Sequence, residues 1–186
     1  MILKYNTDLD MPDILLVPVS VIALIEDQVS SSPIVLLHDS QMNRLLPIWI
    51  GDPEARAIAI VLNKTLMPRP LTHKLLLNVI ESMGGKISRV IVDRLERNTY
   101  FSSIYVSNNG KDIAIDSRPS DAIAIALEAK IPIFVSKVIM DKAAQKNPFP
   151  GVFEQQKREA KLNLTEADLG KMKELLSKAR EREEQS

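Results

Sequence analysis

The chain of 186 residues lacks several features that would define its chemistry. It contains no cysteine, which excludes disulfides, thiolate metal sites and a cysteine nucleophile. Its formal net charge is zero, so nucleic-acid binding would need a local cluster of Arg and Lys. Aromatic residues make up only 4%, and we interpret the single tryptophan, Trp49, as a core or interface anchor rather than a base-stacking platform.

Long apolar runs and the common catalytic signatures are also missing. Pro, Ser or a charge interrupts every apolar stretch before it reaches the length of a membrane span, and the first residues lack the basic-then-apolar order of a signal peptide. We therefore expect a cytoplasmic protein without a membrane segment. There is no Gly-rich phosphate loop, no Gly-x-Ser-x-Gly elbow and no His-Glu-x-x-His pair. If the chain is an enzyme, its nucleophile is expected to be water.

Hydrophobic periodicity predicts an α+β fold with a mixed, largely antiparallel sheet and helices packed on it. Alternating residues predict strands near 17–25, 34–37, 44–50, 90–95, 100–106, 113–115 and 131–135, with Pro47 indicating an edge or a bulge and Asn109-Gly110 a hairpin turn. Helices are expected from Asp52, as N-cap, to about residue 66, over 70–83, and from Pro119 to about residue 130.

The composition divides the chain into a domain over 1–146 and a charged helical tail over 147–186. A capping-box pattern begins at Thr165. Leu169, Met172, Leu175 and Leu176 then form a narrow apolar stripe, suited to docking on the domain or on a protein partner.

Three helix starts carry a proline, and the segment 116–121 is the most informative. Proline disfavours the α conformation of the preceding residue, so Pro119 should be the first helical residue and Arg118 its cap. Free N–H groups beside Arg118 and Ser120 favour an anion such as phosphate. Asp116 and Asp121 could hold a divalent cation or act as a base. The same residues could also be ordinary caps and a structural ion pair.

The other two starts are similar in build. Glu54 follows Asp52 and Pro53, where it is either a capping residue or a metal ligand. Arg69 and Thr72 flank Pro70 as the phosphate-binding candidates of the second start. His73 lies in a first helical turn, where the dipole favours neutral imidazole, which can accept a proton or bind a metal.

In this order and spacing, the segments 46–55, 69–73 and 115–124 resemble the bifunctional nuclease family, over roughly residues 15–144. The resemblance implies an α+β domain with a mixed sheet, usually a homodimer, and for some members nuclease activity on DNA and RNA. This chain departs from the family at Lys74, where the motif commonly reads Thr-His-Asp.

Two hypotheses follow, with a third beside them. The first is a phosphodiester hydrolase using Mg²⁺ or Mn²⁺, with Asp116, Asp121 and Glu54 as metal ligands or bases and His73 orienting or deprotonating water. Arg69, Arg118, Ser120 and Thr72 would bind phosphate. The second is a non-catalytic, dimeric binding or regulatory module, favoured by the zero net charge and Lys74. The third is a small-molecule anion sensor.

Overall fold

The computed structural model describes residues 3–4, 15–27, 29–149 and 166–184. Nine strands form one sheet in the order β7-β6-β5-β8-β2-β3-β4-β9, with β1 paired to β2. Only β5 and β8 run parallel, and every other pair described is antiparallel. The predicted α+β class with a mixed, largely antiparallel sheet is therefore confirmed. The strands are β1 Leu3–Lys4, β2 Leu15–Glu26, β3 Pro33–Asp39, β4 Arg44–Trp49, β5 Lys86–Glu96, β6 Thr99–Asn108, β7 Lys111–Ser117, β8 Ile133–Ser136 and β9 Gln145–Lys146.

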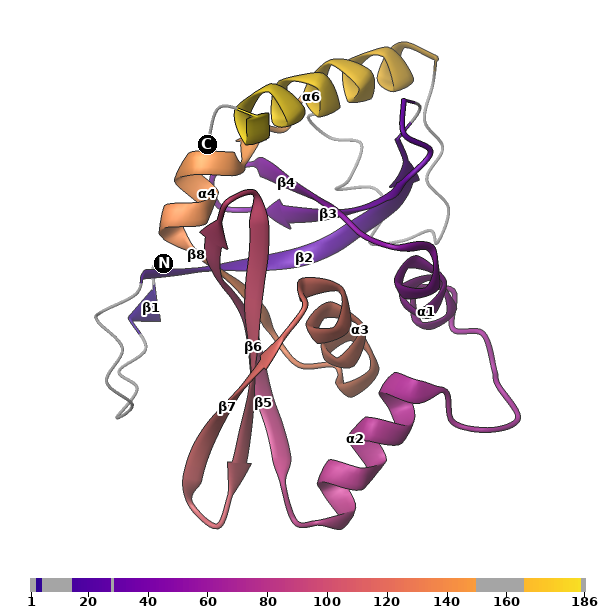
Figure 1. Cartoon of the computed structure of the whole chain (residues 1–186), viewed down its shortest axis with the longest axis vertical. Coiled ribbons are helices and arrows are strands. Elements are labelled where there is room, and N and C mark those ends of the chain that lie inside the picture. Colours follow the sequence, from indigo (N-terminus) through magenta and orange to yellow (C-terminus); the bar gives the residue numbers. More distant parts are fainter. Residues whose placement is uncertain (1–2, 5–14, 28, 150–165, 185–186) are drawn as a thin grey trace.

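Among the described residues, five helices lie against this sheet: α1 Asp52–Leu62, α2 Thr72–Ser82, α3 Pro119–Ala129, α4 Lys137–Ala143 and α6 Glu166–Glu184. Helix α3 lies in the middle, between α1 and α2, and packs on the long β5–β6 hairpin, while α6 crosses the opposite side of β3 and β4 (Figure 1). Within the described residues, no helix combines the length and apolar character that crossing a bilayer requires.

Strand β3 explains how one sheet carries two cores. Val35 and Leu37 belong to the main core under α1, α2 and α3, whereas Ile34 and Leu36 belong to a second core under α6. Alternate residues of a strand point to opposite faces, so a strand covered on both sides needs an unbroken apolar run. Residues 34–37 are such a run, and all four are fully buried.

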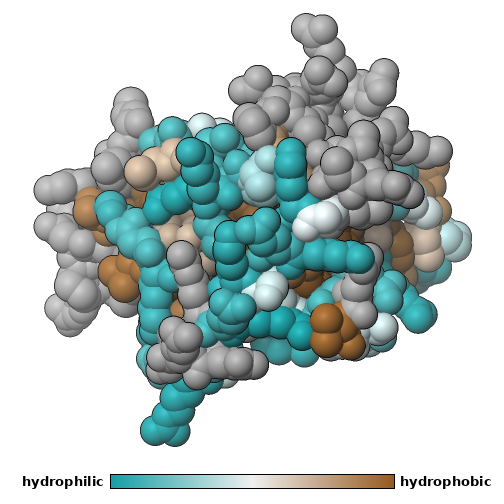
Figure 2. Space-filling view, turned by 90° about the horizontal axis from the view of Figure 1, so that it is seen from above, coloured by the Kyte–Doolittle hydropathy of each residue, from teal (hydrophilic) through white to brown (hydrophobic). Residues whose placement is uncertain are grey.

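Helix α6 covers the second core with the apolar stripe that the sequence predicts. Met172, Leu175 and Leu176 are buried there, and Gln145 Nε2 donates a buried 2.9 Å hydrogen bond to the Leu175 carbonyl. The surface of the described residues on the α6 side of the molecule is mostly hydrophilic (Figure 2). The stripe therefore docks on the domain. The predicted cap at Thr165 and the side chain of Leu169, the first residue of the predicted stripe, lie outside what the structure describes.

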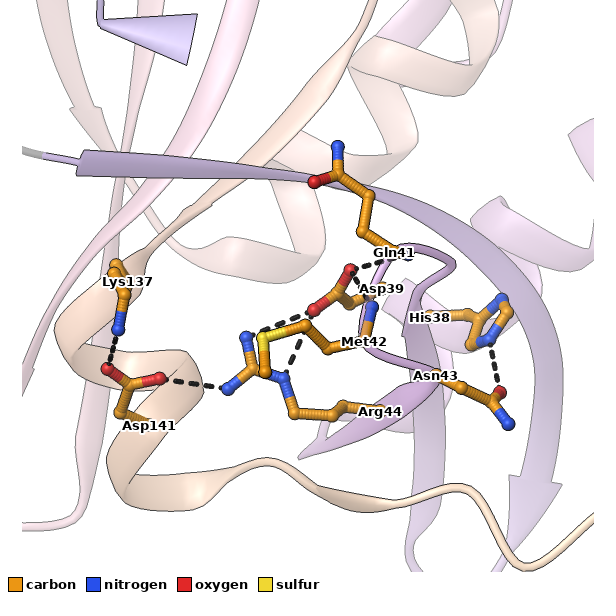
Figure 3. A network of polar contacts seen from close by, with 8 residues as sticks. All are labelled: His38, Asp39, Gln41, Met42, Asn43, Arg44, Lys137 and Asp141. Carbon is orange, nitrogen blue, oxygen red and sulfur yellow. Dashed lines mark hydrogen bonds and ion pairs between the residues drawn. The ribbon is translucent and has the colours of Figure 1, made fainter. Parts of the chain in front are cut away.

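A polar network ties α4 to the β3–β4 turn (Figure 3). Arg44 donates to the fully buried Asp39 through Nε (3.1 Å) and Nη2 (3.0 Å), and through Nη1 to Asp141 on α4 (2.9 Å). Asp141 also pairs with Lys137. Each charge in this network has a partner, which is what burial of Asp39 requires.

Most element boundaries agree with the sequence, and the differences are local. Arg118 is the N-cap of α3 and Pro119 its first residue, as predicted. The N-cap of α1 is Gly51 rather than Asp52, and that helix ends at Leu62 rather than near residue 66. Helix α2 begins two residues late, because Leu71, its N-cap, is still extended. The short elements α4 and β9, of seven and two residues, were not predicted, because such lengths are too short to show a periodic pattern.

Candidate functional site

Charged side chains from the three proline-marked helix starts meet in one continuous chain of contacts. Glu54 lies in the first turn of α1, His73 in the first turn of α2, and Arg118 and Asp121 at the start of α3. Both α1 and α2 pack against α3, so their first turns lie beside its N-terminus. Tertiary packing thus joins Glu54, Arg118, Asp121 and His73, in that order.

Arg118 is the centre of this chain. Its Nη1 lies 2.7 Å from Glu54 Oε1 and its Nε 2.7 Å from Asp121 Oδ2. The Asp121 hydrogen bond, followed by its charge, raises the pKa of the guanidinium above its usual value. The Arg118 side chain is 66% exposed, while Glu54 is 15% exposed. Two carboxylates therefore fix an arginine whose remaining surface faces solvent.

His73 completes the chain at its other end. Its Nε2 lies 3.0 Å from Asp121 Oδ1. Burial by itself raises the pKa of Asp121, but the hydrogen bonds from Arg118 and His73 outweigh it and hold that pKa below its ordinary value. An ionised carboxylate can only accept hydrogen bonds, so we assign His73 Nε2–H as the donor to Asp121.

A cavity of about 440 Å³ opens at the starts of α1 and α3. Glu54, Arg118 and Ser120 line it, together with Gly51 and the C-terminal end of β4. The β5–β6 hairpin contributes Asn98, Thr99 and Tyr100 to its wall. We call this the Arg118 cavity. Its volume lies in the range of small-molecule and cofactor sites.

The lack of a side chain at Gly51 leaves room for the carboxylate of Glu54. A Cβ at position 51 would overlap Glu54 Oε2, so any larger residue would push the carboxylate away. The need for glycine here comes from a close approach and not from a left-handed backbone, because Gly51 has φ −82° and ψ 161°.

Three predicted site residues are placed elsewhere. Asp116 lies on β7, is 79% exposed and faces Arg94 Nη2 at 3.7 Å. Arg69 is exposed in the loop before α2 and lines a different cavity. Thr72 is the exposed first residue of α2 and is not among the residues lining either cavity.

The three predicted metal ligands do not gather around one point. A guanidinium group lies between Glu54 and Asp121, and Asp116 pairs with Arg94. Within the described ranges, no group of three or more His, Asp or Glu side chains is arranged to hold a metal ion. These residues therefore do not fit a shared metal site in this arrangement.

The sequence did not single out the hairpin wall of the Arg118 cavity. Residues 97–98 form the β5–β6 turn, with both Arg97 and Asn98 at positive φ. The turn chemistry was visible in the sequence, but nothing local indicated that this turn faces the starts of α1 and α3.

Comparison with known proteins assigns the chain to a family. Residues 35–148 match the model of the bifunctional nuclease domain. Two uncharacterized proteins of Mycobacterium tuberculosis are 33% identical over 85% of this chain and 92% of their own length. Bifunctional nuclease 1 of Oryza sativa subsp. indica is 29% identical over 62% of this chain and 36% of its own, and bifunctional nuclease 2 of Arabidopsis thaliana is 30% identical over 58% and 34%. The chain belongs to the bifunctional nuclease domain family.

Proposed function

We propose that this protein is a nuclease that hydrolyses phosphodiester bonds of DNA or RNA, with water as the nucleophile and the Arg118 cavity as its site. The observation that carries the proposal is the Arg118 guanidinium, fixed by Glu54 and Asp121 but two-thirds exposed. A held, solvent-facing guanidinium suits a phosphate, whose charge it can stabilise in the transition state. The plant relatives named as bifunctional nucleases support the same reaction class.

The chemistry can be assigned to residues of the cavity wall. Arg118 binds a phosphate oxygen through Nη2, the guanidinium nitrogen that neither carboxylate uses. Glu54 accepts the proton of the attacking water through Oε2, because Oε1 is held by Arg118. A bond forms from the water oxygen to phosphorus, the phosphorus–oxygen bond to the leaving sugar breaks, and that oxygen takes a proton from solvent.

Asp121 and His73 are positioning residues in this proposal. Neither residue lines the Arg118 cavity. Asp121 accepts a hydrogen bond from Arg118 Nε, and His73 Nε2 contacts the other oxygen of Asp121. Direct deprotonation of water by His73 Nδ1 is the alternative role. The two roles differ in the pH profile, because loss of a general base removes the acidic limb and loss of a positioning residue lowers the whole curve.

A requirement for Mg²⁺ or Mn²⁺ stays a prediction, and none of the proposed chemical steps depends on a metal ion. Bound beside the phosphate, such an ion would neutralise charge on its oxygens. Its requirement is measured directly by comparing Mg²⁺, Mn²⁺ and EDTA in the same assay.

The test is cleavage of end-labelled single-stranded DNA, single-stranded RNA and plasmid by the purified chain. Glu54→Gln should lower the rate by about 100-fold or more, the usual effect of losing a general base, and Arg118→Met by a similar factor. His73→Gln should cost about tenfold or less, since it acts through Asp121. Asp52→Asn and Arg56→Met are matched controls on α1, exposed and outside the cavity lining. Wild-type rates in folded Glu54→Gln and Arg118→Met would overturn the proposal.

A second candidate is the dimeric, non-catalytic binding module, and one observation favours it. Leu75 and Val79 on α2 and Met83, its C-cap, are 54%, 44% and 74% exposed. They lie on one side of the helix at spacings of four residues, which is an apolar face of the kind found at protein–protein contacts. A second copy of the chain is the proposed occupant of this face.

Sedimentation of the wild type and of a Leu75→Glu/Val79→Lys variant tests this candidate. A dimer that becomes a folded monomer supports it, and a wild-type monomer at every concentration contradicts it. Cleavage by the wild type, reduced in Glu54→Gln, would show that the protein is not only a binding module. A protein partner for α6 stays a prediction. The buried residues of its apolar stripe pack on the domain and are not available to a partner in this arrangement.

A further inference from the structure

A second cavity lies at the other ends of α1 and α3. Its volume is about 520 Å³, and it lies between the end of α1, the loop that follows it, the start of α2 and the end of α3. Four basic residues and one acidic residue line it: Lys64, Arg69, Lys74, Lys130 and Glu128. The remaining wall is largely apolar, including Leu66, Met67 and Leu71. We call it the basic pocket.

The four cations of the basic pocket have no ion-pair partner in the part of the chain that the structure describes. Among the described residues, none of Lys64, Arg69, Lys74 and Lys130 has an ion pair or a side-chain hydrogen bond. Gathering four like charges around a single carboxylate is unfavourable, because each cation raises the potential at the others. An anionic ligand removes this repulsion.

Two of the lysines also occupy backbone positions that favour glycine. Lys64, just beyond α1, has φ 52°, and Lys130, the C-cap of α3, has φ 54°. The left-handed conformation is unfavourable for a residue with a Cβ, which is why glycine is common at helix C-termini. At both ends the chain has instead a long cationic side chain that lines the same cavity.

The two cavities are joined by the parallel helices α1 and α3. Glu54 and Arg118, at the starts of these helices, line the Arg118 cavity, and Val61 and Glu128, near their ends, line the basic pocket. Each helix has 11 residues, so the axis between the cavities is about 16 Å long. That length equals about five phosphates at the B-form spacing of 3.4 Å along one strand, and fewer in an extended strand.

We propose that the basic pocket binds the phosphate backbone of a nucleic-acid strand, a few nucleotides from the phosphate at Arg118. This inference rests on the proposed nuclease function and adds a substrate-anchoring site to it. Lys74 contributes a cation to the pocket, while its neighbour His73 faces Asp121.

Binding is measured by fluorescence anisotropy of labelled single-stranded oligonucleotides of three and twelve nucleotides, in EDTA, across a salt series. The key variant is Lys64→Gly/Lys130→Gly. Glycine relieves the left-handed backbone, so the melting temperature should rise by about 2–4 °C for each site. Affinity for the twelve-mer should fall at least tenfold, and the slope of log K against log salt should decrease by about 0.7 for each lost phosphate contact.

A second variant keeps the proposal testable without the backbone change. Arg69→Gln/Lys74→Gln removes the other two cations and should weaken twelve-mer binding by a similar factor. Lys86→Ala/Lys111→Ala is the charge control, with two exposed lysines on β5 and β7 outside the pocket lining. It should change affinity by less than twofold, and three-mer binding should change little in any variant.

The outcomes separate this inference from the proposed function. Unchanged twelve-mer affinity in both pocket variants, or a control effect as large as theirs, would overturn the basic pocket as a strand site even if the protein cleaves. Weakened binding in the pocket variants supports it even if no cleavage is found, because the measurement is made in EDTA. An oligonucleotide that fails to bind the wild type overturns it outright.

Discussion

The two ends of the α1–α3 helix pair treat charge in opposite ways. At the starts, Arg118 pairs with both Glu54 and Asp121 over 2.7 Å contacts. At the ends, four cations face one carboxylate without an ion pair among the described residues. The helix dipoles favour carboxylates at the starts of the two helices and lysines at their ends, so they complement the charges found at each. Pairing distinguishes them: the cation at the first end is held by two carboxylates, whereas the cations described at the second have no ion pair among the described residues.

The largest effect on this contrast is expected from breaking the paired end. Arg118→Met leaves Glu54 and Asp121, which are 15% and 28% exposed, as neighbouring carboxylates without their cation. We expect a loss of about 1–3 kcal/mol in the free energy of unfolding, measured by urea titration at pH 7. Arg56→Met, with an exposed arginine on α1, should change it by less than about 0.5 kcal/mol. Equal effects of the two substitutions would show that the contacts of Arg118 do not stabilise the fold.

The next effect is a pH dependence that comes from Asp121. Its pKa is lower in the folded protein than the ordinary value of about 3.9. Its stabilisation is therefore fully present above about pH 4 and is lost as the pH falls through the folded pKa. In urea titrations from pH 7 to pH 3, Asp121→Asn should be less stable than the wild type at pH 7, and the difference should shrink in acid. A difference independent of pH would contradict this assignment.

A smaller effect tests the position of Glu54 without changing charge. Gly51→Ala introduces a Cβ that Glu54 Oε2 must avoid. Because the clash is with the end of a flexible side chain, the free energy of unfolding should change by less than about 1 kcal/mol. Cleavage should fall about tenfold if Oε2 accepts the proton of water, since small displacements of a catalytic group are costly. Ala at Gly170, an exposed position in α6 where a Cβ meets nothing within 4 Å, is the control.

The smallest effect is expected at the basic pocket, where α1 and α3 end. Glu128→Gln removes the one carboxylate in the lining of the basic pocket. Stability should change by only a few tenths of a kcal/mol, because Glu128 has no ion pair among the described residues. Affinity for the twelve-nucleotide strand should rise about twofold to threefold as the pocket becomes more positive. Weaker binding would indicate that Glu128 orients a lysine rather than opposing the anion.

Much of the fold could be predicted because its signals are local. Proline at 119 restricts Arg118 and starts a helix, and Asn109-Gly110 supplies the positive φ angles of a hairpin turn. Boundaries without such a restriction were less accurate. Helix α1 ends at Leu62, although alanine-rich periodicity extended the prediction to residue 66.

The site was predictable only in part. Glu54, His73, Arg118 and Asp121 were candidates, and the structure brings them together. Asp116 was a candidate because it precedes Arg118 in sequence, but it lies on β7 facing Arg94. Lys64 and Lys130 were missed. The sequence signal for them was a lysine at a helix end that has no glycine. A lysine at that place is also explained by its favourable interaction with the helix dipole.

By itself, the sequence determined where helices start, which segments alternate as strands and which family the motifs resemble, because steric restriction and periodicity act over a few residues. Only the tertiary structure decided that Arg118 meets Glu54 and that four separate cations line one cavity. The reason is geometric. Packing α1 and α2 against α3 fixes which helix ends are neighbours, and no spacing along the chain encodes that arrangement.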